Sequence, residues 1–128
     1  MKTEQTNIYV QAVLSGETNN LVAILDKSIE AFAPTSGEII TDAAAIVGGL
    51  SLVSKIISNL KIVRTYNGED NWQAAVFEGK LDNKDIQFSD HLHINHLGLI
   101  DRIEIFLRPS SLAGSFYSRM TSLISQLQ

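Results

Sequence analysis

The sequence predicts an α+β domain, in which helices are set apart from a mostly antiparallel sheet. Two observations indicate this class. The second half of the chain reads as consecutive strands joined by short polar turns, and the first half carries helical patterns with one strand among them. The 128 residues contain no cysteine and are enough to bury one hydrophobic core without disulfides. We therefore treat residues 1–128 as a single domain.

Charge and motif content exclude several functional classes. The net charge is -4, and the scattered lysines and arginines form no basic cluster for nucleic acid. No apolar run approaches the roughly 20 residues of a membrane span, and residues 1–7 lack the pattern of a signal peptide. Neither a phosphate-binding glycine loop nor a dinucleotide fingerprint is present. We expect a cytoplasmic protein without a cofactor, nucleic-acid partner or membrane partner.

The first third of the chain predicts two short helices and a strand. Residues 4–15 suit a helix, with Gly16 as its stop signal. A second short helix is predicted over residues 21–25. A strand over residues 28–33 follows, and residues 34–37, Pro-Thr-Ser-Gly, have the composition of a turn.

A long helix is predicted next, with Thr41 as its N-cap. Gly48 and Gly49 interrupt its pattern, and each costs about 1 kcal/mol relative to alanine in a helix interior. This pair indicates either close packing against a neighbour or room for a ligand. The apolar stripe of this helix consists of Ile46, Leu50, Val53, Ile57 and Leu60.

Strands joined by turns are predicted from residue 61 onward. Turn signals at Asn67-Gly68, Asp82-Asn83 and His96-Leu97-Gly98 separate four strands. Pro109 ends the last strand, and Ser110 or Ser111 can cap a final helix. The strands are predicted over residues 61–66, 72–81 and, on either side of the last turn, 84–109. The apolar positions of the final helix are Leu112, Phe116, Leu123 and Leu127.

Asp90 is the strongest candidate for activity. By the period-two rule it shares one strand face with Phe88 and Leu92, in the middle of an apolar surface. A carboxyl group there must be hydrogen-bonded, kept protonated or used in chemistry. Two interpretations follow: an acid that lines a cavity, or a structural buried carboxyl group.

Three stretches resemble the nuclear-transport-factor-two-like superfamily, which includes ketosteroid isomerases and SnoaL-like polyketide cyclases. The segment GLIDRIEIFLRP, residues 98–109, is similar to the ending of SnoaL-like members. The segments IYVQAVLSGETNNLVAILDKSIEAFAP, residues 8–34, and SDHLHIN, residues 89–95, resemble parts of ketosteroid isomerase. The resemblance implies a cone-shaped, curved sheet around the long helix, an apolar cavity open at one end, and a homodimer formed through the outer sheet face.

The resemblance to ketosteroid isomerase covers two of its three catalytic positions. Tyr9 falls at the oxyanion-hole tyrosine and Asp90 at the protonated aspartic acid, but Ala33 occupies the position of the general base. Glu30 points to the other face of its strand, and Asp26 lies back in the predicted second helix. Since isomerisation needs a base within reach of the substrate, the family reaction is not expected.

The resemblance therefore implies binding of a small apolar molecule by Tyr9 and Asp90. Both groups can donate a hydrogen bond to a carbonyl or hydroxyl oxygen. Two alternatives stay open. One is a cyclase-like, isomerase-like or dehydratase-like enzyme with Asp90 as acid and base, and the other is a non-catalytic dimerisation module.

Other side chains could line the ligand pocket. The aromatic residues alternatively fill the core, as strand aromatics usually do. His91 and His93 share the outer sheet face, and without an evident third ligand we expect no metal there, but a subunit interface nearby. The lining candidates are Trp72, Phe77, Phe88, Phe106, Ala33 and Gly49.

Overall fold

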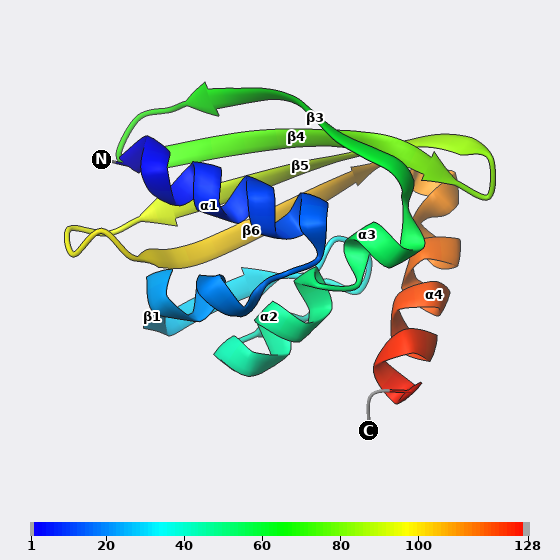
Figure 1. Ribbon diagram of the computed structural model, residues 1–128, viewed down its shortest axis with the longest axis horizontal. Helices are drawn as coiled ribbons and strands as arrows, with labels where there is room; N and C mark the ends of the chain where they lie inside the picture. The colour runs from blue at the N-terminus through cyan, green and yellow to red at the C-terminus, as the bar shows by residue number, and fades with distance from the viewer. Residues whose placement is uncertain (1, 127–128) are drawn as a thin grey trace.

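The computed structural model describes residues 2–126, which form one curved six-stranded sheet with helices packed against it (Figure 1). The strands are β1 (Leu25–Phe32), β2 (Ile39–Ile40), β3 (Ser58–Asn67), β4 (Trp72–Leu81), β5 (Lys84–Ile94) and β6 (Ile100–Arg108). The helices are α1 (Lys2–Ser15), α2 (Ala43–Leu50), α3 (Val53–Ile56) and α4 (Ala113–Gln126), with 3-10 turns η1 (Asn19–Ile24) and η2 (Ser110–Leu112).

The strands lie in the order β2-β1-β6-β5-β4-β3. Only β1 and β6 are parallel neighbours, and the other pairs are antiparallel, which confirms the predicted α+β class. Asp82 and Asn83 form the two-residue turn between β4 and β5, and both have positive φ angles of 53° and 65°. Asparagine and aspartate tolerate this left-handed backbone, so they suit a tight hairpin.

The predicted long helix over residues 41–60 is wrong. The chain instead forms α2, turns at Ser51 and Leu52, forms the single turn of α3, and enters β3. The carbonyl of Gly49 accepts from the backbone N–H of Leu52 at 3.1 Å, which tightens the end of α2. The two glycines weaken a helix at this point, and pairing of β3 with β4 captures the residues beyond it. Asp42, not Thr41, caps α2, since its carboxylate accepts from the N–H of Ala44.

The placement of Asp26 in a second helix is also wrong. That helix is the 3-10 turn η1, and β1 already begins at Leu25, so Asp26 is a strand residue. Its carboxylate accepts hydrogen bonds from Ser28 and from Asn95, which hold an irregular stretch where β1 bulges away from β6. The pKa of Asp26 lies below its ordinary value because these donors, the backbone N–H of Ser28 first, favour the ionised form.

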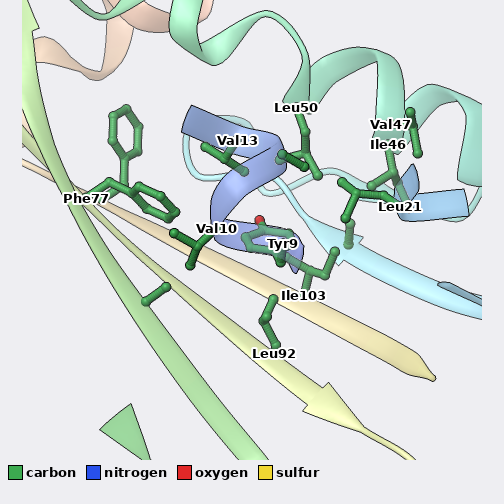
Figure 2. Close-up of a cluster of buried hydrophobic side chains, with 14 of the residues drawn as sticks. Tyr9, Val10, Val13, Leu21, Ile46, Val47, Leu50, Phe77, Leu92 and Ile103 are labelled. Atoms are coloured by element: carbon green, nitrogen blue, oxygen red, sulfur yellow. The ribbon is translucent and has the colours of Figure 1, made fainter. Parts of the chain in front are cut away.

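The core lies between α1 and one face of the sheet, which we call the inner face. In β5 the burial alternates without a break from Ile86 to Ile94, as the period-two pattern predicts. Figure 2 shows Tyr9, Val10 and Val13 of α1 above Leu92 and Ile103 of the strands. Near them lie Leu21 of η1 and Ile46, Val47 and Leu50 of α2.

The final strand and helix of the C-terminal segment form as predicted, but Ser110 and Ser111 lie in the 3-10 turn η2 and the predicted serine cap of the helix is wrong. The final strand ends at Arg108, and the Arg108-Pro109 peptide bond is cis. Leu112 and Phe116 are buried, and α4 stands at one end of the sheet (Figure 1). Leu127 lies outside the described residues. Within residues 2–126 no helix combines the length and apolar character that crossing a membrane requires.

Candidate functional site

Tyr9 and Asp90 meet in the core although 81 residues separate them in the chain. Helix α1 carries the phenol and the middle of β5 carries the carboxyl group. The Tyr9 hydroxyl donates to Oδ2 of Asp90 at 2.6 Å. Tyr9 is 0% exposed and Asp90 is 4% exposed, so neither is solvated. The two residues singled out by the sequence therefore form one buried pair.

Burial shifts the pKa values of both members of the pair upward. Desolvation raises the pKa of Asp90 from 3.8 to about 7, and the hydrogen bond from Tyr9 partly opposes that rise. Desolvation, followed by the charge of Asp90, raises the pKa of Tyr9 well above its ordinary value. The phenol therefore stays protonated and donates, while the carboxyl group gains and loses its proton near neutral pH.

One oxygen of Asp90 has no partner. Oδ1 is buried and forms no hydrogen bond to any of the described residues, whereas Oδ2 is satisfied by Tyr9. Native proteins leave few buried polar atoms unpaired, because each costs about 1–3 kcal/mol. This oxygen can accept a hydrogen bond when the acid is ionised and donate one when the acid is protonated.

A second buried polar pair lies one helical turn before Tyr9 and was missed by the sequence analysis. The hydroxyl of Thr6 donates to Oε1 of Gln73, and both residues are almost fully buried. The neighbouring Gln5 bonds Gly98 through its amide nitrogen, and its buried Oε1 lacks a partner among residues 2–126. The alternation along β4 could have predicted that Gln73 is buried, because it lies on the same face of the strand as Ala75 and Phe77.

Two of the predicted lining residues lie on the inner face with Asp90. Phe77 and Phe88 are paired across β4 and β5 and are 1% and 4% exposed. The ring of Phe88 packs at 5.1 Å from that of Phe116 in α4. Both phenylalanines are members of the hydrophobic core.

Trp72 and Phe106 lie on the opposite side of the sheet, which corrects the expectation that they line one pocket with Asp90. Trp72 is paired with His93 and Phe106 with Ser89, and these partners alternate with Asp90 along β5. Successive side chains of a strand point to opposite faces, so both aromatics lie on what we call the outer face. Phe106 is 55% exposed.

The two predicted histidines also lie on the outer face, as expected. His91 contacts Ser89 through Nε2 at 2.9 Å and packs its ring against Phe106. His93 bonds Asp101 through Nδ1 at 2.7 Å. Across the described part of the chain, no group of three or more His, Cys, Asp or Glu side chains is placed to hold a metal ion.

The small residues Ala33 and Gly49 belong to neither α1 nor β5, the two elements that carry Tyr9 and Asp90. Ala33 follows β1, and its N–H donates to the carbonyl of Glu38 at 3.1 Å. A Cβ added at Gly48 or Gly49 would meet no atom within 4 Å, so close packing does not require these glycines. Glu30 faces Arg102 on the outer face, at 3.7 Å, and does not replace the missing base.

Two prominent surface pockets of residues 2–126 are lined by residues other than Tyr9 and Asp90. One, of about 710 Å³, lies at the end of the sheet where Trp72 and His93 are found. The other, of about 750 Å³, lies at the far end of the same strands, beside Lys61, Lys80 and Arg108. Tyr9 and Asp90 are instead buried, 0% and 4% exposed.

Comparisons with known proteins agree on the fold. An uncharacterised protein with a cystatin-like fold from Silicibacter pomeroyi is 22% identical with a TM-score of 0.86, over 94% of this chain and 85% of that one. A steroid delta-isomerase from Pseudomonas aeruginosa is 13% identical with a TM-score of 0.89, over 98% and 93% of the two chains. A protein of unknown function from Burkholderia xenovorans, described as NTF-2 like, is 16% identical with a TM-score of 0.68, over 88% and 91%.

At these identities the likeness establishes the fold and nothing finer. No family model matches the sequence, and no curated protein matches it. The chain has the nuclear-transport-factor-two-like fold that its sequence resemblance implied.

Proposed function

We propose that the protein binds a small, largely apolar molecule through a carbonyl or hydroxyl oxygen held by Tyr9 and Asp90. The observation that supports this most is the unpaired Oδ1 of Asp90, buried beside a satisfied Oδ2. A ligand oxygen would supply the missing hydrogen bond. The apolar side chains around the pair would contact the rest of such a molecule.

The chemistry of the pair suits either kind of oxygen. With its pKa raised to about 7, Asp90 is present in both protonation states near neutral pH. The protonated acid donates to a carbonyl oxygen, and the ionised acid accepts from a hydroxyl group. Tyr9 keeps its proton and holds the carboxyl group in one orientation through Oδ2.

Entry of a ligand requires a rearrangement of the core. Tyr9 is fully buried, and Leu21 of η1 and Leu50 of α2 stand beside it (Figure 2). Helix α2 is short and contains Gly48 and Gly49, around which there is open space. A shift of this helix would uncover the pair without breaking strand pairing in the sheet.

An enzymatic role for Asp90 is the second candidate. A carboxyl group with a pKa of about 7 can take up and release a proton at neutral pH, as a cyclase-like or isomerase-like reaction would need. Ala33 provides no second base, and Glu30 is engaged on the outer face. Asp90 would therefore act as both acid and base, and D90N would abolish turnover while preserving the fold.

Native mass spectrometry of freshly purified protein tests the binding proposal. We expect a bound molecule that is released on denaturation, and we expect D90A to lose it. Asp85→Asn is the matched control, since Asp85 lies on β5 like Asp90 but its carboxylate is exposed and paired with Lys80 of β4. The proposal would be contradicted if protein from several expression hosts had the mass of the chain alone and if carbon-detected NMR gave an Asp90 pKa near 3.8.

We also propose that the chain forms a homodimer through the outer face of the sheet. Phe106 of β6 and Tyr66 of β3 are 55% and 54% exposed on this face. Val76 of β4, a strand between these two, is buried but does not belong to the main hydrophobic core. Exposed aromatics on a sheet face are typical of an interface. Sedimentation velocity should show a dimer that F106E dissociates and that V22E, at an equally exposed site on η1, leaves intact. A monomeric wild-type chain would exclude the dimer.

A further inference from the structure

The outer face carries a groove that is separate from the Tyr9–Asp90 pair. Its volume is about 710 Å³, within the range of small-molecule sites. The side chains of Trp72, His93 and Arg102 belong to neighbouring positions on β4, β5 and β6. The bulged part of β1, held by Asp26 and Asn95, forms the opposite wall together with Thr41.

His93 is oriented in this groove by Asp101. Nδ1 of His93 lies 2.7 Å from Oδ1 of Asp101, and a carboxylate can only accept, so Nδ1 carries the proton. Neutral His93 then has a lone pair on Nε2, and no described residue donates a hydrogen bond to that atom. The groove therefore contains an oriented acceptor that is free for a ligand.

An aromatic surface lies next to this acceptor. The ring centroids of Trp72 and His93 are 5.1 Å apart, with their planes tilted by 56°. Trp72 is half-buried, so part of its indole is available for contact. An aromatic ring of a ligand could pack against the indole while a substituent reaches Nε2 of His93.

The charges around the groove cancel. Lys27 and Arg102 are balanced by Glu30 and Asp101 among the lining residues. Arg102 is further held by Glu104 at 2.6 Å and lies over the ring of Phe32, 4.3 Å from its centroid. It is not a free anchor for an anion. The balance favours a neutral ligand over a carboxylate or phosphate.

We propose that this groove is a second binding site, for a neutral aromatic molecule that carries a hydroxyl group. The hydroxyl donates to Nε2 of His93 and the ring packs on Trp72. Asp101 is a positioning residue, since it fixes which nitrogen accepts. The site does not depend on the buried pair, because none of its lining residues contacts Tyr9 or Asp90 through a hydrogen bond.

The only tryptophan of the chain reports directly on this groove. We would follow the single indole N–H resonance of Trp72 by nitrogen-edited NMR during titration with phenol and, separately, with anisole. Anisole has the same ring but cannot donate. We expect phenol to shift the indole signal saturably and to bind about two- to tenfold more tightly than anisole, as one hydrogen bond would allow.

Three variants make the test specific. His93→Phe and Asp101→Asn should each remove the preference for phenol, the second because the ring is no longer held in one tautomer. His91→Phe is the matched control on the same face and should retain the preference. D90N should retain it too, which separates this site from the interior one. An unmoved indole signal, equal affinities for phenol and anisole, or the same loss in His91→Phe would overturn the proposal.

Discussion

The two faces of β5 carry two hydrogen-bonded pairs in different environments: Tyr9–Asp90 on the inner face and His93–Asp101 on the outer face. Asp90 points inward, is 4% exposed, and has one hydroxyl partner and one unpaired oxygen. Three residues later His93 points outward and is paired with Asp101, with both side chains more than a quarter exposed. Strand β5 therefore carries a buried carboxyl group on one face and, on the other, a partly exposed histidine whose aspartate partner comes from β6.

This contrast shows that exposure to solvent, more than residue type, decides the chemistry of each carboxyl group. Asp101 is partly exposed to solvent, so the hydrogen bond that it accepts from His93 contributes about 1 kcal/mol. Asp90 is almost fully buried, so its charge is costly and its pKa rises to about 7. The inner carboxyl group can exchange a proton near neutral pH, whereas the outer one serves to orient a histidine.

The largest expected effect comes from the packing that keeps Asp90 dry. Leu92 is 0% exposed and adjoins Asp90 on the inner face. Leu92→Ala should lower the free energy of unfolding by about 2–5 kcal/mol, because it removes buried methyl groups and leaves a cavity. Ser89→Ala, on the outer face of β5, should cost about 1 kcal/mol or less. Urea unfolding measures both, and equal losses would show that the two faces are not differently packed.

The pH dependence of stability is the next largest effect. A folded-state pKa above the unfolded one means that the folded protein binds the proton more tightly. Wild-type stability should therefore fall as pH rises from about 4 to 7 and level off above 7. The loss should be on the order of a few kcal/mol.

Variant D90N isolates this contribution. It should remove that fall while D101N, its control on the outer face, should keep it. The measurement is urea unfolding of the three proteins at pH 4 to 8. If the difference in stability between wild type and D90N did not change with pH, Asp90 would not be an acid with a raised pKa.

Tyr9→Phe should have a smaller effect on stability and should shift the pKa of Asp90 in one direction. It removes the donor to Oδ2, so neither oxygen of the carboxyl group then has a partner among the described residues. The unfolding free energy should fall by about 1–3 kcal/mol. The pKa of Asp90 should rise further, because the bond from Tyr9 is the influence that lowers it. Carbon-detected NMR titration would show the direction, and an unchanged or lower pKa would contradict it.

The smallest effect is expected for the outer pair. D101N should change the unfolding free energy by about 1 kcal/mol or less, because the hydrogen bond from His93 is partly exposed and the amide oxygen of asparagine can still accept it. Thermal unfolding of the variant and the wild type measures this. A loss as large as that of Leu92→Ala would mean that the His93–Asp101 pair is not a surface interaction.

Much of the candidate site could be predicted from the sequence. The alternation along β5 placed Asp90 inward and both histidines outward, since side-chain direction in a strand is a local property. The same rule could have placed Trp72 and Phe106 outward. Trp72 differs in parity from Ala75 and Phe77, and Phe106 from Ile103. The prediction grouped these aromatics by residue type, as pocket-lining or core residues, and did not apply strand parity to them.

Other features could not be predicted because they depend on distant parts of the chain. The break between α2 and α3 follows from competition between a glycine-weakened helix and pairing of β3 with β4. The contact of His93 with Asp101 occurs beside an irregularity in the register between β5 and β6, which no local pattern reports. Thr6 and Gln73 pair across 67 residues.

Local patterns were enough to predict the α+β class, the four-strand meander, the positions of its turns and the face on which Asp90 lies, because each follows from backbone geometry and turn chemistry within a few residues. Long-range packing, in contrast, brings Tyr9 to Oδ2, leaves Oδ1 without a described partner, and forms a groove on the outer face. Those features depend on how helices and strands far apart in the chain pack together, and packing sets the solvation on which the chemistry of a carboxyl group depends.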